Sequence, residues 1–183
     1  MQKKGFTLVE LLIVIGILAI LVAAVVVVLN PAQLLAQARD GQRMSDLDAV
    51  RSAINLYMTT ASSVAFTATT TLTATTTGAP ATWTGAVVNA STAVTNAGWV
   101  NIDLSSISGG SPLSRLPIDP TNSGSYQYGY RSNAASTTYK LISRLESTKY
   151  RANMATDGGA FSTCSTYAEA TCWYEIGNDV TNL

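Results

Sequence analysis

The sequence contains no histidine among its 183 residues. Histidine is the commonest general base near neutral pH and the commonest metal ligand, so its absence argues against the most frequent catalytic sites. The sequence also has no Gly-x-Ser-x-Gly motif, no Walker loop and no carboxylate pair at a meaningful spacing. We therefore expect no catalytic residues, and a membrane-tethered hydrolase ranks far below a structural protein.

Charged residues are also scarce, since Asp, Glu, Lys and Arg make up only 12% of the chain. The eleven basic side chains balance the eleven acidic ones, so the formal net charge is zero. Such a balance gives no overall signal for nucleic-acid binding. A surface with few charges suits a subunit that packs against many copies of itself.

One long hydrophobic run is present, and it spans the nineteen residues Leu11–Leu29 without a charge. As a helix it is about 28 Å long, close to the hydrocarbon thickness of a bilayer. Lys3 and Lys4 precede the run and no basic residue follows until Arg39, which predicts an amino end in the cytoplasm and a body outside. A cleaved secretory signal, whose apolar core is usually shorter, and a plain single-span anchor are the alternatives.

A single carboxylate, Glu10, lies at the start of this run. An ionised carboxylate deep in a membrane costs of order 2.5–3.5 kcal/mol, and less near the headgroups. A solvated, interfacial Glu10 is one interpretation. A plain anchor gains nothing from such a residue, so the neighbouring sequence has to explain it.

Residues 3–12 read Lys-Lys-Gly-Phe-Thr-Leu-Val-Glu-Leu-Leu, and this stretch resembles the prepilin signature of type IV pilins and type II secretion pseudopilins. The resemblance implies that a prepilin peptidase cuts after Gly5 and that Phe6 becomes an N-methylated amino terminus. It also implies that Glu10 pairs with the Phe6 amine of a neighbouring subunit as the helices bundle. In a low-dielectric core a paired carboxylate costs much less than a lone one.

The same resemblance implies an α+β fold of the type IV pilin kind, with a long N-terminal helix packed against an antiparallel β-sheet head. The expected parts are a leader (1–5), a transmembrane and filament-core helix (6–29), an amphipathic helix (30–60) and a head with a Thr-rich connection (61–183). The implied partners are other copies in a helical homo-oligomer, the prepilin peptidase/methyltransferase, an inner-membrane assembly platform with its ATPase, and membrane lipid before assembly.

Pro31 predicts a joint in the stem. Either the helix kinks around Val27–Pro31, or a new helix starts at Pro31 with Asn30 as its cap. Helical periodicity continues to Thr60, so a helix from Phe6 to about Thr60 would be on the order of 80 Å long.

An apolar stripe at steps of three and four predicts the buried face of residues 32–60. Asp40 with Arg43, and Asp48 with Arg51, have the i, i+3 spacing of helical ion pairs. We expect this mixed-charge face to be solvated, with contacts to neighbouring subunits as the alternative. The stripe comprises Leu34, Ala38, Gly41, Met44, Leu47, Val50, Ile54 and Tyr57.

Residues 59–95 are rich in Thr, Ala, Ser and Gly, which predicts a long surface excursion with loose strands or a mobile loop. Further on, Asp103 is an expected N-cap of a short turn. The segment Leu116–Asn122, with two prolines three residues apart, resembles the segment that enters the sheet in major pseudopilins. Its carboxylate, Asp119, is expected to have a structural role.

Alternating residues at 126–130 and 139–145 predict a β-hairpin connected by residues 132–136, and residues 172–177 predict a further strand. The tyrosines of this hairpin are expected to form a packing face. Five basic residues are expected to be solvated, with contact to DNA phosphates as the less favoured interpretation. These are Arg131, Lys140, Arg144, Lys149 and Arg151.

The two cysteines, Cys164 and Cys172, are expected to form a disulfide if the head is exported. A two-cysteine metal site would lack further ligands, and no cofactor is expected. Major pseudopilins hold a calcium ion in their late loops, and this resemblance makes Asp157 a candidate calcium ligand.

The favoured function is therefore a structural subunit of a type IV pilus filament. It would reside in the cytoplasmic membrane as a single-span prepilin before assembly, and in an extracellular filament afterwards. A type II secretion major pseudopilin, and a membrane-tethered surface module for adhesion or DNA uptake, are the alternatives.

Overall fold

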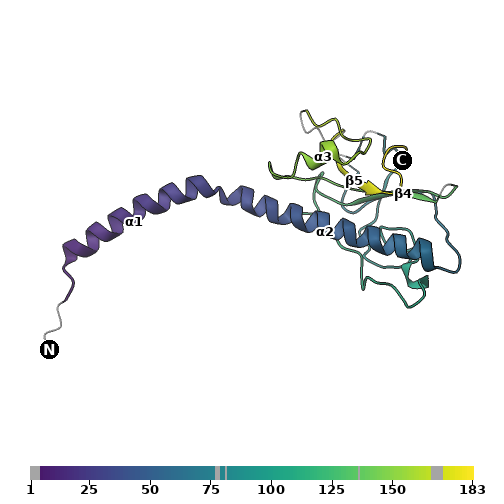
Figure 1. Ribbon diagram of the computed structural model, residues 1–183, viewed down its shortest axis with the longest axis horizontal. Coiled ribbons are helices and arrows are strands. Elements are labelled where there is room, and N and C mark those ends of the chain that lie inside the picture. The colour runs from purple at the N-terminus through teal and green to yellow at the C-terminus, as the bar shows by residue number, and fades with distance from the viewer. Residues whose placement is uncertain (1–4, 77–78, 81, 136, 166–170) are drawn as a thin grey trace.

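The computed structural model describes residues 5–76, 79–80, 82–135, 137–165 and 171–183. A two-part helical stem extends away from a head in which a mostly antiparallel sheet packs on the second helix (Figure 1). The predicted α+β class is confirmed. The helices and strands are α1 (Leu8–Leu29), α2 (Pro31–Thr60), β1 (Thr69–Leu72), β2 (Val87–Val88), η1 (Leu104–Ser106), β3 (Gly129–Asn133), β4 (Thr138–Ser143), α3 (Asn153–Thr156) and β5 (Tyr174–Gly177).

Helix α1 begins at Leu8, two residues later than expected, because Thr7 forms its N-cap. The Glu10 backbone N–H donates to Thr7 Oγ1 at 3.3 Å, and the Thr7 backbone N–H donates to Glu10 Oε2 at 2.9 Å. This reciprocal pair is a capping box. The window Leu8–Val26 is long and apolar enough to cross a membrane, and none of it is buried within the chain. Such a helix needs cover from lipid or from other helices.

The stem is jointed at Asn30, whose backbone is left-handed with φ 40°. The residue before a proline is disfavoured in the helical region, and Asn tolerates the left-handed one. Asn30 caps α2 by accepting a hydrogen bond from the Gln33 backbone N–H at 3.4 Å, and Pro31 occupies the first helical turn. Of the two alternatives for the joint, the second is therefore confirmed: a new helix starts at Pro31 with Asn30 as its cap. The axis of the stem bends between α1 and α2 (Figure 1).

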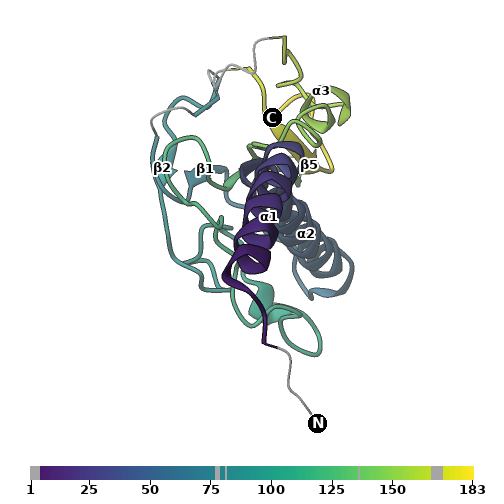
Figure 2. The ribbon, with the colours of Figure 1, turned by 90° about the vertical axis from the view of Figure 1, so that its left-hand side faces the viewer.

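The five strands lie in the order β2-β1-β3-β4-β5. Strands β1 and β2 are parallel and the other pairs are antiparallel. Viewed along the stem, β1 and β2 lie to one side of the helices, whereas β5 lies close to the helices (Figure 2). The Thr-rich segment at 59–95 therefore supplies β1, which lies inside the sheet, and β2 at its edge. Of the two alternatives for this segment, the strands are present, and they are paired within the sheet.

The β3–β4 hairpin is present, but β3 lies three residues later than the predicted strand 126–130, and Ser132, which was expected in the connection, pairs with Tyr139 inside the ladder. Residues that alternate along these strands face opposite layers. One face packs on α2, and tyrosine hydroxyl groups on that face donate hydrogen bonds to side chains of α2. Tyr139 donates to Asn55 Oδ1 at 2.8 Å and Tyr128 donates to Asp46 Oδ2 at 2.8 Å. The tyrosines thus form a packing face, as predicted.

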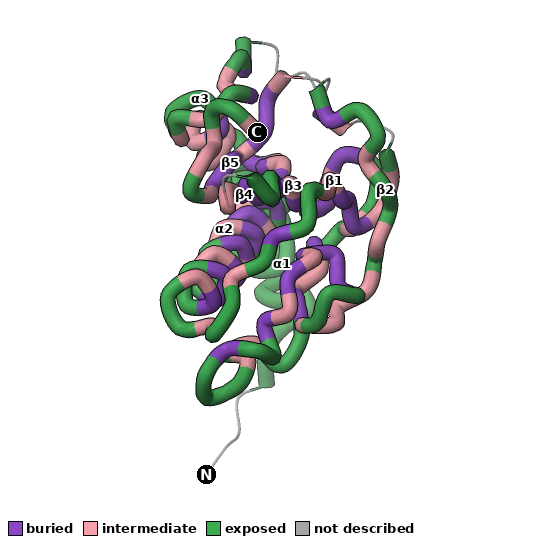
Figure 3. The backbone as a smooth tube through the Cα atoms, turned by 90° about the vertical axis from the view of Figure 1, so that its right-hand side faces the viewer, coloured by how far each residue is buried: buried purple, intermediate pink, exposed green. Residues whose placement is uncertain are grey.

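Both faces of the sheet are covered. The core against α2 contains Leu47, Val50, Ile54 and Tyr57 from the helix, and Figure 3 shows this buried side of α2 facing the strands. On the opposite face, loops bring in further apolar side chains. This second cluster consists of Leu72, Trp83, Ile142, Phe161 and Trp173.

The predicted apolar stripe is correct from Leu47 onward, and Met44 is half-buried against a small apolar cluster of the head. The stripe is wrong at its amino-terminal end, where Ala38 is exposed. Leu34 is exposed, whereas Asp40 and Arg43 are completely buried. The expectation of a solvated charged face is therefore wrong at these two residues. The physical reason is that the head covers this part of α2 with carboxylates and backbone N–H groups instead of apolar side chains.

Candidate functional site

The amino-terminal candidate site consists of Gly5, Phe6, Thr7 and Glu10. Phe6 is 85% exposed, and a Cβ atom added at Gly5 would meet no other atom within 4 Å. The bond between Gly5 and Phe6 thus lies in an exposed segment just before the helix. A peptidase needs such access to the backbone.

The Glu10 carboxylate is held at the start of α1, close to that bond. Its Oε2 atom accepts from Thr7 Oγ1 at 2.7 Å as well as from the Thr7 backbone N–H at 2.9 Å. The carboxylate therefore lies beside the residue that follows Phe6. Cleavage after Gly5, methylation of Phe6 and pairing of Glu10 stay predictions.

A second polar cluster joins the stem to the head around the buried Arg43. Its guanidinium makes a two-bond contact with Asp119, with Nε to Oδ2 at 2.7 Å and Nη2 to Oδ1 at 3.0 Å. Nη2 also donates to Thr121 Oγ1 at 3.0 Å. Nη1 donates to Asp40 Oδ1 at 2.9 Å and to Glu146 Oε1 at 2.6 Å. All five N–H donors of this side chain are used.

Asp40 links the same cluster to the chain after β4. Its carboxylate accepts from the backbone N–H of Ser147 at 2.7 Å and from that of Glu146 at 3.0 Å. Arg39 adds a two-bond contact to Glu146, at 2.6 and 2.8 Å. The hydrogen bond from Arg39 lowers the pKa of the Glu146 carboxyl. Asp119 has the structural role expected of it, and we call these five charged residues the Arg43 cluster.

Burial by itself would lower the pKa of Arg43, but the hydrogen bonds and charge of Asp119 and its other carboxylate partners outweigh this, so the pKa is raised. The guanidinium therefore stays charged, and the carboxylates around it are compensated in the interior. The i, i+3 pair Asp40–Arg43 that the sequence suggested is present at 2.9 Å, and Asp48–Arg51 is present on the surface at 3.0 Å.

A third group of charges lies on the sheet face opposite α2. Lys140 is completely buried; its Nζ is 2.9 Å from Glu175 Oε1 and 4.9 Å from the centre of the Phe161 ring. The prediction of a solvated Lys140 is therefore wrong, because loops cover the second face of the sheet. Arg131 lies on this face too and donates to the Thr82 carbonyl at 3.3 Å. The five basic residues do not form one patch.

Asp157 lies close to this group and organises the backbone around it. Its carboxylate accepts from the Gly159 backbone N–H at 3.0 Å and from the Glu175 backbone N–H at 2.8 Å. Burial raises the pKa of Asp157 to about 6. Within the described ranges, no group of three or more His, Cys, Asp or Glu residues has the geometry to hold a metal ion. Calcium binding at Asp157 stays an untested hypothesis.

Cys164 and Cys172 form a disulfide, as expected for an exported head. The bridge closes a short loop against Leu145 and Met154, in a small apolar cluster next to the main core. The bridged segment before β5 therefore packs against the chain after β4.

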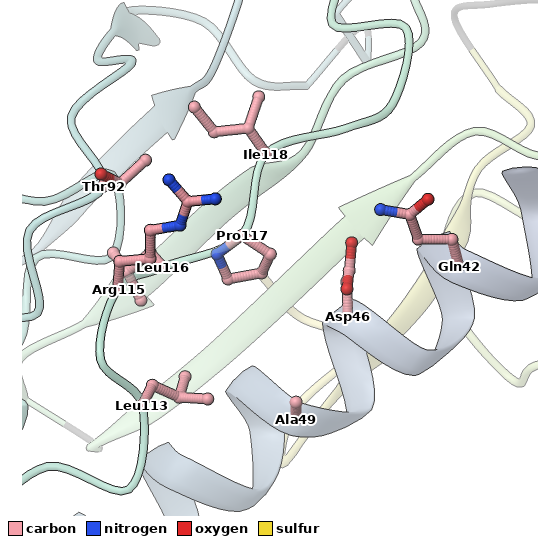
Figure 4. Close-up of a pocket in the computed structure, with 9 residues that line it drawn as sticks. All are labelled: Gln42, Asp46, Ala49, Thr92, Leu113, Arg115, Leu116, Pro117 and Ile118. Atoms are coloured by element: carbon pink, nitrogen blue, oxygen red, sulfur yellow. The ribbon is translucent and has the colours of Figure 1, made fainter.

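A groove of about 400 Å³ runs between α2 and the loop before β3 (Figure 4). Its one carboxylate, Asp46, already accepts from Tyr128 at 2.8 Å. The guanidinium of Arg115 points away from α2 in the close-up (Figure 4). These groups do not converge on a reaction centre. The lining residues are Gln42, Asp46, Ala49, Thr92, Leu113, Arg115, Leu116, Pro117 and Ile118.

The Arg43 cluster was missed as a unit by the sequence reasoning. Two signals for it were available: an Asp-x-x-Arg spacing in a chain with few charges, and the carboxylate between two prolines at Asp119. Their pairing across 76 residues is a property of the tertiary structure.

Comparison with known families finds a match for the first part of the chain. Residues 1–26 match the prokaryotic N-terminal methylation motif, so the match covers the signal and most of α1 but not the head. No curated protein and no solved structure matches the chain. This amino-terminal segment carries the class III signal that is characteristic of type IV pilins and pseudopilins.

Proposed function

We propose that this protein is the structural subunit of a type IV pilus filament. It is inserted in the cytoplasmic membrane with its amino end inside, cut after Gly5 by the prepilin peptidase, and methylated on Phe6. An assembly platform with its ATPase then extracts it into an extracellular, helical homo-oligomer. DNA is the less favoured ligand of the finished filament.

The observation that carries this proposal is the exposure of α1. A whole span of apolar side chains, Leu8–Val26, is not covered by the head, and it lies within the residues 1–26 that match the methylation motif. Such a surface is stable only in lipid or in contact with similar helices. Subunits that move from lipid into contact with similar helices can be stored in the membrane and later added to a filament.

Glu10 supports the assembly step, because its carboxylate is the one acidic group in the first turn of α1. Inside a helix bundle it needs a positive partner, and the new amine of Phe6 from a neighbouring subunit supplies one. We expect Glu10→Ala to insert and to be cut normally but to give few or no filaments. These outcomes are measured by membrane fractionation, by amino-terminal sequencing and by yield of sheared filaments.

Thr7→Ala is the matched control, because it removes the same capping box and leaves the carboxylate in place. Loss of an N-cap costs about 1 kcal/mol of helix stability, so filaments should still form. Equal defects in both variants would mean that Glu10 acts as a cap and not as an assembly partner.

A type II secretion pseudopilin is the second candidate. The sequence of the Leu116–Asn122 segment favours it, and in the structure this segment carries Asp119 into the Arg43 cluster. Mass spectrometry of filaments sheared from cells tests both candidates. Long surface filaments composed mainly of this chain, with methylated Phe6 at the amino terminus, support the pilus. Methylated protein confined to the cell envelope supports the pseudopilus, and protein that retains residues 1–5 contradicts both.

A further inference from the structure

Lys140 in β4 and Glu175 in β5 form a buried charge pair between two neighbouring strands. Both side chains are 0% exposed, and Lys140 Nζ lies 2.9 Å from Glu175 Oε1. The distance would allow a hydrogen bond but the angles do not, and in the part of the chain that the structure describes neither atom has another hydrogen-bond partner. An ammonium group has three N–H donors, so this buried cation is poorly compensated.

The buried Arg43 shows the opposite situation in the same head. Its guanidinium donates hydrogen bonds to three carboxylates and one threonine hydroxyl. Removal of two charges from water is costly, and their attraction repays the cost only where further hydrogen bonds satisfy the remaining donors and acceptors. Lys140 and Glu175 lack those bonds. A reaction that converts this pair into an uncharged group would therefore remove the cost of burying both ions.

The loop before β5 holds the Glu175 carboxyl in place through two residues. The Phe161 backbone N–H donates to Glu175 Oε2 at 2.6 Å. Gly159 packs so closely on the same group that a Cβ atom added there would overlap both Oε2 and Cδ. The Phe161 ring also covers the amine, since its centre is 4.9 Å from Lys140 Nζ. The carboxyl thus presents Oε1 to the amine, while Oε2 has the kind of donor that stabilises a developing oxyanion.

The amine lies close to the carboxyl carbon as well. Since a C–O bond is about 1.23 Å long, Nζ is at most about 4.1 Å from Glu175 Cδ, and reacting atoms are typically about 3–3.5 Å apart. We propose that Lys140 and Glu175 form an intramolecular amide bond, an isopeptide cross-link between β4 and β5. The Nζ–Cδ bond forms, the Cδ–Oε1 bond breaks, and one water molecule leaves.

The protons of this step balance without any further reactant. The ammonium group gives one proton to Oε1, the neutral amine attacks Cδ, and a second proton follows to Oε1, which departs as water. The third proton stays on the amide nitrogen, and Oε2 becomes the amide oxygen with its bond from Phe161. Because both side chains are 0% exposed, water is kept away from the product and hydrolysis is slow. The proposal concerns the folded head and does not depend on the proposed function.

Mass spectrometry of the full-length protein, with its amino terminus determined in the same sample, tests the proposal. After reduction of the disulfide, we expect the wild type to be lighter than its sequence mass by one water molecule. Trypsin cuts after Lys and Arg, so a digest should contain residues 132–144 linked to residues 152–183 and uncut after Lys140. In denaturant, an amine-reactive reagent should label Lys149 but not Lys140, because the nitrogen of an amide is unreactive.

Lys140→Arg is the matched control. It keeps a cation on β4, but a guanidinium is not deprotonated in proteins, so this variant should have its full sequence mass and give no linked peptide. A loss of water that persists in Lys140→Arg would lie elsewhere in the chain and would overturn the proposal. The proposal also fails if the wild type has its full sequence mass and its Lys140 is cut by trypsin and labelled like Lys149, since the two residues would then be an ion pair and nothing more.

Discussion

Replacement of Arg43 by methionine is the sharpest test of how the head is attached to the stem. Methionine has a similar length and keeps the apolar packing, but it removes the positive charge and all five donors. Asp40 and Asp119, whose side chains are completely buried, would then lose their common cation. Asp119 would keep only the backbone N–H groups of Thr121 and Asn122 as donors in the described contacts.

The expected cost follows from the burial of this cluster. Removal of one partner from a buried ion pair destabilises a protein by about 3–5 kcal/mol, because the other charge stays in the interior uncompensated. For a chain of this size each kcal/mol lowers the melting temperature by about 2–4 °C. We therefore expect Arg43→Met to melt roughly 6–20 °C below the wild type.

Tryptophan fluorescence of the full-length protein in detergent is a suitable assay, because all three tryptophans lie buried in the head. Arg51→Met is the matched control. It removes an i, i+3 pair whose side chains are 44% and 51% exposed, and such surface pairs contribute less than about 1 kcal/mol.

A second variant tests whether the buried, uncompensated charge causes the loss of stability. If buried, uncompensated charge is the cause, Arg43→Met combined with Asp119→Leu should recover part of the loss, since a buried pair can be replaced by apolar groups at little cost. An Arg43→Met variant as stable as Arg51→Met, or a double variant worse than the sum of both single changes, would refute the cluster as the attachment of head to stem.

Two further predictions concern the carboxyl-terminal part of the head. Burial raises the pKa of Asp157 to about 6, so the folded protein binds more protons than the unfolded chain between pH of about 4 and 6. Its contribution to stability must fall as the pH rises through that window, and melting curves of Asp157→Asn should lack this slope; parallel profiles would contradict it. The double variant Cys164→Ser/Cys172→Ser should lose about 2.5 kcal/mol in urea unfolding, for a sequence separation of 8, and wild type under reducing conditions should match it.

The stem could be predicted from the sequence because its determinants are local. The apolar run, the basic residues before it, the Gly5–Phe6 pair and the Asn30-Pro31 joint are each read within a few neighbouring residues. Backbone sterics at proline and the cost of charge in lipid act at that range. The alternating strands β3 and β4 were accessible for the same reason.

The burial of charges could not be predicted in this way, because it depends on residues far away in the sequence. Whether Arg43 faces water or Asp119 is decided 76 residues later, and whether Lys140 is solvated depends on the loop that brings Phe161 over the sheet. The Thr-rich run around Thr69 has little local preference beyond extended structure, and it became a strand only where β3 offered hydrogen-bond partners. The sequence by itself determined the apolar stem that fits a membrane, since that is a matter of consecutive residues. Only the tertiary structure decided how the head holds the stem, because the free energy of a buried charge depends on which partners the fold brings within a few ångströms of it.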